Sequence, residues 1–457
     1  MTETKNSLSL GRIGRIVRIL LLFAGACQIL FGLAYLAANL GKMQNYGETY
    51  ELLDAGKSLV FDDRTGLIYP LILAAADLLH GITGVPFMLP VQILQLVLAY
   101  ISSSLVLKSF CNVTTGNRLY VETANLFLLT SAPLLQIHLS GLPYSLALSV
   151  LCVQYVVTKR AFGKEYEKKM MWQWLLLFVL EELILPWTGF LGALFALICL
   201  LFTRGEKKIQ IRGLLVAAVL LICFHVLAGI FILKPGNRGK MQNSPIAIAA
   251  CHLTWSRLAD NYFFWDEEIK EIFSEEDAVA VTNTESLVLT DFGATVDAEY
   301  GYFGAQKVYL HMMANVFQNR TREAVSDQIA DLKSYGFMPV TVFSNLKGYG
   351  RSQTGFHVGR LREHSPELGS LLIMISLYLI PISILLSGAV ITLLSKKMVN
   401  INSAFIFAVF VIAVVITAFS GYFPFDYRRG YLLWYLMEIP GAFAMVSATE
   451  GERKLLW

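Results

Sequence analysis

Residues 61–84, FDDRTGLIYPLILAAADLLHGITG, decide how the rest of the chain is arranged. Their apolar run is almost long enough to cross a bilayer, which takes about 20 residues of helix. The run nevertheless follows two aspartates and contains Asp77 and His80, and ionisable side chains are costly in hydrocarbon. The stretch is therefore either a membrane span or a helix that lies at the membrane beside a functional site.

The composition is typical of a protein that crosses the membrane several times. The 457 residues are 55% hydrophobic and 16% charged, with a mean hydropathy of +0.56, whereas soluble domains carry about 25% charged residues. The six cysteines show no paired spacing, which argues against a disulfide framework and a zinc site. Apolar runs predict spans over 16–39, 87–107, 119–136, 143–158, 172–202, 213–233, 370–394, 401–419 and 431–448. The long run 172–202 is broken at LPWTG, so we expect a hairpin of two short helices there.

The distribution of basic residues decides the opening question. Basic clusters follow or precede several spans: Arg12, Arg15 and Arg18; Lys159, Arg160, Lys164, Lys168 and Lys169; Arg204, Lys207, Lys208 and Arg212; Lys396 and Lys397; Arg453 and Lys454. If 67–84 is not a full span, every cluster falls on the cytoplasmic side, as the positive-inside rule requires. If it is a span, the rule fails repeatedly. We therefore predict that 67–84 is an interfacial or re-entrant helix on the outer face.

This topology predicts an all-α polytopic plasma-membrane protein with about ten transmembrane helices and both termini cytoplasmic. An N-terminal module, 1–234, carries a first outer loop at 40–86. An α-rich extracytoplasmic domain, 235–369, is inserted before the C-terminal transmembrane helices, 370–457. The inserted domain has 12 Lys+Arg against 17 Asp+Glu, so its net charge is −5 while the whole chain is +3.

The chemistry is expected on the outer face. The short cytoplasmic loops contain no Gly-rich phosphate loop and no D-x-D pair. An enzyme that works outside the membrane has to take an activated substrate from the lipid phase, and lipid-linked sugars are the commonest such donors. We expect no nucleic-acid partner.

Residues 45–205 resemble the membrane module of GT-C-type glycosyltransferases. The resemblance lies in the order GETYELLDAGKSL, GLIYPLILAAADLLHGITG, LPVQILQLVLAYISSSLVL and ANLFLLTSAPLLQIHLSG, followed by the helical hairpin. YRRGYLLWYLMEIPGAF near the C-terminus is similar to an Arg-Tyr pair that often opens the final span of these enzymes. The chain is most similar to bacterial, protein mannosyltransferase-like families that use polyprenyl-phosphate sugars.

The resemblance implies an inverting hexosyl or pentosyl transfer from a polyprenyl-phosphate carrier to an unidentified glycan, lipid or protein acceptor. Glu48 occupies the position of the catalytic acid, which is usually Asp in the family, and would act as a general base. Asp54, Asp62 and Asp63 are the alternative bases, although FDDRTG is equally read as a capped turn in which Arg64 offsets the two aspartates. The resemblance also leaves room for a divalent metal ion, to which no ligands are assigned.

The remaining candidates would bind substrate. Arg428 and Arg429 suit a departing phosphate because Arg binds phosphate oxygens in a bidentate manner, but they would serve equally as anchors at the headgroups. Tyr50 is expected to share a face of helix 44–59 with Leu53. Glu181 and its neighbour Glu182 are intramembrane acids, of which at most one is expected in a site.

Two other classes of function stay open. The chain lacks the second acid that is common at the start of the fourth span, where it reads HLSGLPYSLAL, and it lacks an Arg where the hairpin turns. These departures favour a catalytically inactive relative that binds a lipid carrier as an assembly partner. A transporter is disfavoured because the two halves show no repeat.

Overall fold

The protein is described by a computed structural model. The described residues are 46–59, 66–111, 118–130, 132–162, 168–186, 188–202, 207–232, 261–265, 267–272, 274–282 and 291–326, with residue 246 and single positions between 19 and 43. The candidate site residues Asp62, Asp63, Arg64, Arg428 and Arg429 lie outside them. Of Glu48 the structure describes the backbone, within a helix, but not the side chain.

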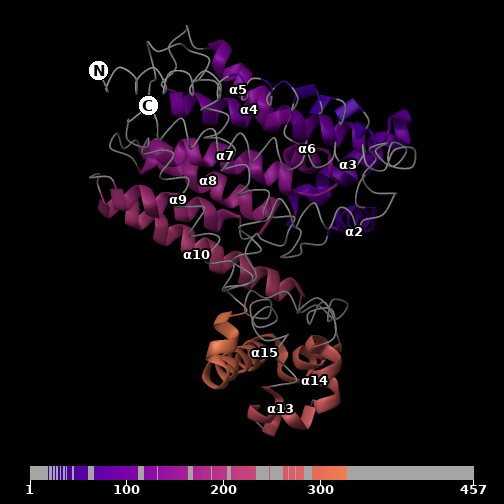
Figure 1. Ribbon diagram of the computed structural model, residues 1–457, viewed down its shortest axis with the longest axis vertical. Coiled ribbons are helices and arrows are strands. Elements are labelled where there is room, and N and C mark those ends of the chain that lie inside the picture. Colours follow the sequence, from indigo (N-terminus) through magenta and orange to yellow (C-terminus); the bar gives the residue numbers. More distant parts are fainter. Residues whose placement is uncertain are drawn as a thin grey trace, which may run out of the picture.

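Throughout these described ranges the fold is all-α and contains no β-strand. The first group of helices consists of α2 (Tyr46–Lys57), α3 (Ile68–Thr83), α4 (Met88–Cys111), α5 (Arg118–Thr130), α6 (Ala132–Leu139), α7 (Tyr144–Ala161), α8 (Lys168–Ile184), α9 (Gly189–Phe202) and α10 (Lys207–Ile232). Figure 1 shows them as one layered group of helices. The predicted break in the run 172–202 is confirmed, because α8 ends at Ile184 and α9 begins at Gly189.

One helix in the described part of the chain is long and apolar enough to cross a membrane. It is residues Met88–Ser109, with a mean hydropathy of 1.7. Only 44% of its most apolar window is buried, so more than half of an almost uncharged helix faces outward. A second apolar helix, Ile68–Thr83, is shorter.

The predicted span over 119–136 does not correspond to one described helix. The structure has two helices there, α5 ending at Thr130 and α6 running from Ala132 to Leu139. Pro133 gives the reason, because proline has no N–H to donate to the preceding turn and its ring clashes with the carbonyl four residues earlier. α6 is thus a short separate helix, and its end at Leu139 leads into the loop before α7.

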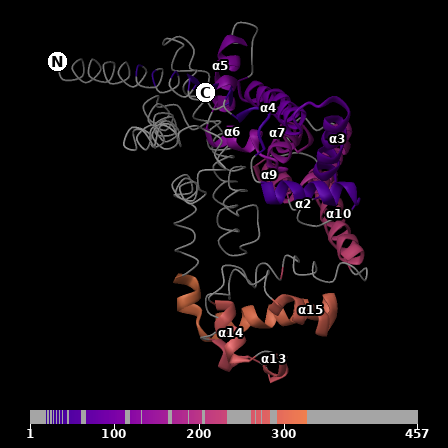
Figure 2. The same cartoon turned by 90° about the vertical axis from the view of Figure 1, so that its right-hand side faces the viewer.

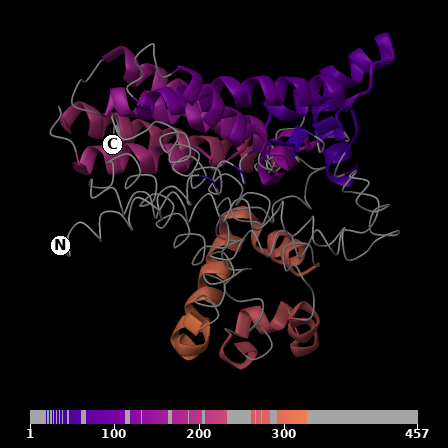
Figure 3. The same cartoon turned by 45° about the horizontal axis from the view of Figure 1, so that its top comes forward.

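Helix α7 is the centre of the bundle. It packs against α4, α8 and α9, and 13 of its 18 residues are buried, so it is covered on all sides. Its polar residues are accommodated locally: the Ser149 hydroxyl donates to the Ser145 carbonyl at 2.9 Å, and the Thr158 hydroxyl donates to the Gln154 carbonyl at 2.7 Å. Figure 3 shows α10 along the edge of the same layer.

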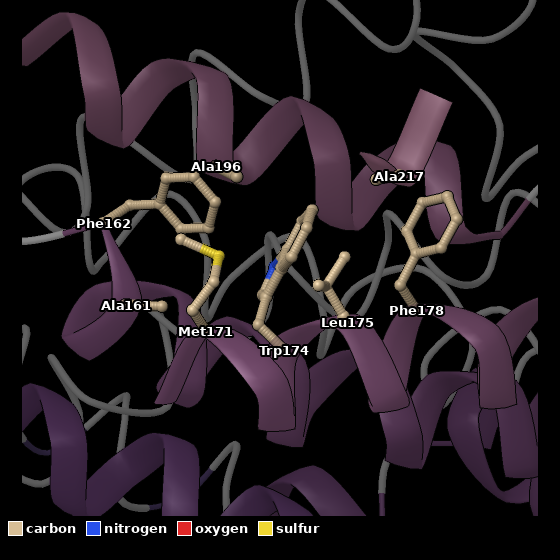
Figure 4. Close-up of a cluster of buried hydrophobic side chains, with 8 residues drawn as sticks. All are labelled: Ala161, Phe162, Met171, Trp174, Leu175, Phe178, Ala196 and Ala217. Atoms are coloured by element: carbon tan, nitrogen blue, oxygen red, sulfur yellow. The ribbon is translucent and has the colours of Figure 1, made fainter. Parts of the chain in front are cut away.

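An aromatic core joins the end of α7 to α8, α9 and α10 (Figure 4). Trp174 lies at its centre, 5.0 Å from Phe162 in a T-shaped arrangement and 5.9 Å from Phe178, measured between ring centroids. The cluster also contains Ala161, Met171, Leu175, Ala196 and Ala217. It brings the C-terminal end of α7 together with the first turns of α8, which are the ends that carry Lys159, Arg160 and Lys168.

A second group of helices follows α10 along the chain. It contains the 3-10 turn η4 (Tyr262–Phe264), α13 (Glu267–Ile272), α14 (Glu275–Thr282) and α15 (Asp291–Asn319), which has a kink at Gly301. Its core is formed by Trp265, Ala278, Val296, Ala305, Val308, Tyr309 and Met312. Trp265 is therefore a core residue of this group.

Candidate functional site

Two glutamines at the start of α4 connect the elements around them. Gln92 and Gln95 are fully buried, and their spacing of three residues puts them on one face of the helix. Both polar atoms of the Gln92 side chain are hydrogen-bonded: its Oε1 accepts from the Gly41 N–H at 2.6 Å, and its Nε2 donates to the carbonyls of Lys42 at 2.9 Å and Leu139 at 2.8 Å. It therefore joins the segment that precedes α2 to the loop between α6 and α7.

Gln95 makes the corresponding connection to α3. Its Nε2 donates to the Tyr69 hydroxyl oxygen at 3.1 Å and to the Leu142 carbonyl at 3.3 Å. Its Oε1 is buried without a hydrogen-bond partner among the described atoms. Because Gln92 and Gln95 bond to residues 139 and 142, the short loop 140–143 is held from both sides.

Helix α2 is attached to the same loop through a close approach of Thr49 and Gly141. The Thr49 hydroxyl donates to the Gly141 carbonyl at 3.4 Å. A Cβ atom at position 141 would lie 2.2 Å from the Thr49 Oγ1, so only glycine fits there. Next to this contact, His138 Nδ1 lies 2.8 Å from the Ser145 Oγ, and burial lowers the pKa of His138 to about 4. We call Thr49, Tyr69, Gln92, Gln95, His138 and Gly141 the polar end cluster.

The entrance to α3 is docked on the turn between α8 and α9. The Leu67 N–H donates to the Leu183 carbonyl at 2.7 Å. Gly66 has a φ of +65°, and a Cβ there would lie 2.5 Å from the Leu183 carbonyl oxygen, which requires glycine on both counts. The residues that lead into α3, Gly66 and Leu67, thus lie against the hairpin turn. Tyr69, two residues further on, belongs to the polar end cluster.

The two acids of the hairpin have different surroundings. Glu181 and Glu182 are both fully buried. Glu182 Oε1 accepts the Gly189 N–H at 2.9 Å, so this carboxylate caps the first turn of α9, where helix N–H groups lack partners within the helix and negative charge is favoured. The role of Glu182 is structural, and Glu181 remains the candidate of the pair.

One side of helix α2 is buried and the other is exposed. Tyr50 is 50% exposed, whereas Thr49, Leu52, Leu53 and Gly56 are buried. Tyr50 lies at the border of the buried side, because α2 packs on the side that carries its small residues: a Cβ on Gly56 would lie 2.1 Å from the Pro70 carbonyl oxygen of α3. The two acids Glu51 and Asp54 are both exposed.

Asp77 and His80 each have a partner close to them in the structure. Asp77 forms an ion pair of 2.7 Å with Lys57, the last residue of α2, and this hydrogen-bonded partner raises the pKa of Lys57. His80 Nδ1 lies 2.7 Å from the Val85 carbonyl oxygen. In the described ranges, no group of three or more His, Cys, Asp or Glu residues could hold a metal ion.

Most of the polar end cluster could not be predicted from the sequence. Gln92 and Gln95 were visible as two amides three residues apart in an otherwise apolar run, VQILQL, which is the signal that would have found them. Thr49, Tyr69 and Gly141 carried no signal, since their contacts join positions 26 to 92 residues apart.

The comparisons with known proteins give no family for the chain. No protein-family model, no curated protein and no solved structure matches it.

Proposed function

We propose that this protein is a GT-C-type glycosyltransferase of the plasma membrane that transfers a sugar, with inversion, from a polyprenyl-phosphate carrier to an acceptor on the outer face. The proposal includes about ten transmembrane helices, cytoplasmic termini, an extracytoplasmic domain over 235–369 and C-terminal helices over 370–457. A membrane setting is supported by the exposed apolar helix Met88–Ser109.

One observation carries the proposal: the first loop, the loop 140–143 and the hairpin turn converge at one end of the bundle. Thr49 attaches α2 to Gly141, and Leu67 attaches the entrance of α3 to Leu183. The basic residues that end α7 and begin α8 lie at the opposite end, because these antiparallel helices each run from one end to the other. The positive-inside rule then favours the cytoplasm for the basic end and the outer face for the polar end cluster.

This arrangement supplies a position for the proposed base. Glu48 precedes Thr49 directly in α2, so its backbone is fixed by the contact with Gly141. In the proposed reaction Glu48 takes the proton of the acceptor hydroxyl as that oxygen attacks the anomeric carbon. The bond from the anomeric carbon to the phosphate oxygen breaks, and polyprenyl phosphate leaves with the electron pair. Arg428 and Arg429 would neutralise the departing phosphate.

The role of substrate-binding residues follows the same geometry. Tyr50 and Asp54 lie on the exposed side of α2, where a substrate could reach them without displacing the contact at Thr49. Asp62 and Asp63 belong to the segment between α2 and the docked Gly66, so together with Asp54 they are the next candidates if Glu48 is not the base. Arg64 in the same segment would bind substrate. A divalent metal ion could assist at the phosphate.

The test is native mass spectrometry of the purified protein with a panel of polyprenyl-phosphate sugars. It compares the wild type with Glu48→Gln and with the matched control Glu51→Gln, which changes an exposed acid of the same helix. We expect all three proteins to bind donor, and only the wild type and Glu51→Gln to release sugar-free polyprenyl phosphate. Equal turnover by Glu48→Gln would exclude it as the base.

Binding of the carrier without turnover by any variant would instead favour the inactive relative that serves as an assembly partner. The fully buried segment 139–149, which contains no acid, is the feature that points in this direction. If no donor binds at all, the transferase proposal is refuted, and the resemblance to GT-C-type glycosyltransferases is one of architecture alone.

A further inference from the structure

Helix α3 has an exposed stripe that is entirely apolar. Leu71, Ala75, Leu78 and Ile82 are exposed, and Leu78 and Ile82 are 67% and 75% exposed. At about 100° per residue, these positions fall within a sector of about 60° around the helix axis. A side of a helix that faces water would carry polar residues at these positions.

The opposite face of the same helix is equally apolar and is buried. Tyr69, Leu73 and Ala76 point into the protein, where Tyr69 accepts the hydrogen bond from Gln95. The core-facing side of α3 and its exposed stripe are therefore two different sides of the helix. α3 already has a core contact, and the stripe is a second apolar surface that points away from it.

Helix α2 covers a third side of α3. Gly56 lies directly against Pro70, and Lys57 pairs with Asp77. By helical spacing, Pro70 and Asp77 lie on one side, between the buried face and the exposed stripe. Because α2 carries exposed Glu51 and Asp54 on its own outer side, the polar surface of this helical pair belongs to α2 and the apolar surface to α3.

The next helix, α4, also exposes apolar residues. The chain turns at Gly84, which caps α3 in the left-handed conformation, and α4 then exposes Ile93, Leu94, Val97, Ile101 and Leu105. α3 and α4 pack against each other, and α4 is the helix that is apolar and long enough to span a membrane. Figures 1 and 2 both place α3 at the border of the helical layer, with α2 beside it.

We propose that Leu71, Ala75, Leu78 and Ile82 form a lipid-contact surface that holds α3 among the acyl chains of one leaflet, while α2 lies between α3 and water. The occupant of this surface is the hydrocarbon of phospholipids, because α3 packs against the candidate span and its exposed stripe carries no charge. The proposal rests on the membrane setting of the proposed function and not on its transfer chemistry.

The test places the photo-cross-linking amino acid p-benzoylphenylalanine at Leu78 or Ile82 of the full chain. The protein is reconstituted in dioleoylphosphatidylcholine vesicles, irradiated and analysed by mass spectrometry. The matched control carries the same probe at Glu51, which is exposed on the polar side of α2. We expect phosphatidylcholine adducts at Leu78 and Ile82 and none above background at Glu51. Two sites in the stripe keep the test informative if one variant does not fold.

Two results would overturn the proposal. Cross-links from Leu78 and Ile82 to protein, either a second copy or another segment of this chain, would show that the stripe is a protein interface. Equal lipid adducts at the stripe and at Glu51 would show no selective embedding. The two proposals can fail separately. Lipid adducts at the stripe together with no donor turnover would refute the transferase proposal and support the lipid-contact surface.

Discussion

Substitution of Gly141 by alanine tests whether the contact between α2 and the loop 140–143 is as close as the structure shows. The added Cβ would lie 2.2 Å from Thr49 Oγ1, 2.7 Å from Thr49 Cγ2 and 3.0 Å from Thr49 Cβ. All three atoms belong to a short β-branched side chain that is itself buried, so the clash cannot be relieved by a flexible end. α2 or the loop has to move.

The expected magnitude follows from two opposing effects. Overpacking a tight site costs about 1–3 kcal/mol. Replacing glycine by alanine in a conformation that alanine accepts stabilises by about 0.4–1 kcal/mol, because the unfolded chain loses entropy. We therefore expect Gly141→Ala to lower the free energy of unfolding by about 1–2 kcal/mol, measured by reversible unfolding in mixed detergent micelles.

A double-mutant cycle assigns the effect to this contact. Thr49→Ala removes Oγ1 and Cγ2, so the combination with Gly141→Ala should recover most of the loss, with a coupling energy of about 0.5–2 kcal/mol. Gly81→Ala is the matched control, because a Cβ there meets nothing within 4 Å and helix propensity favours alanine by up to about 1 kcal/mol. Additive effects of Thr49→Ala and Gly141→Ala within about 0.5 kcal/mol would refute the reasoning.

Three further predictions concern the hairpin and the polar end cluster. Glu182→Leu should destabilise by about 1–3 kcal/mol because it leaves the buried Gly189 N–H without an acceptor, whereas Glu182→Gln keeps an acceptor and should cost less; equal losses in unfolding measurements would contradict the capping role. Gly66→Ala should cost at least about 2 kcal/mol, since it adds a clash with the Leu183 carbonyl to the strain of a positive φ, and limited proteolysis between α2 and α3 should become faster; unchanged cleavage would speak against the docking. Burial lowers the pKa of His138 to about 4, below its unfolded value of about 6.5, so the unfolded chain binds the extra proton first and stability should fall as the pH drops from about 6.5 to 4, by up to about 3 kcal/mol. His138→Asn should remove that part of the pH dependence in thermal unfolding, and an identical pH profile in this variant would contradict the assignment.

The sequence by itself determined which segments are helical. Expected helices at 44–59 and 67–84 appear as Tyr46–Lys57 and Ile68–Thr83, and the break of the hairpin falls at LPWTG as predicted. These features depend on local properties: the length of apolar runs, their periodicity, and the Pro and Gly residues that interrupt them. Pro133 is another such residue, and it lies in the first turn of α6, just after the end of α5.

Only the tertiary structure decided which side of each helix packs and what its polar residues contact. Tyr50 is exposed and Thr49 is buried because Gly141 and Gly56 allow close approach at particular points, and such contacts join positions that are distant in sequence. Glu181 and Glu182 are adjacent and alike in sequence, yet Glu182 caps α9 because its carboxylate reaches Gly189 across the turn. The division of α3 into a buried side, a side under α2 and an apolar outer side likewise depends on its neighbours. Hydrophobicity specifies that a residue avoids water, whereas the packing of the helices specifies whether protein or lipid replaces it.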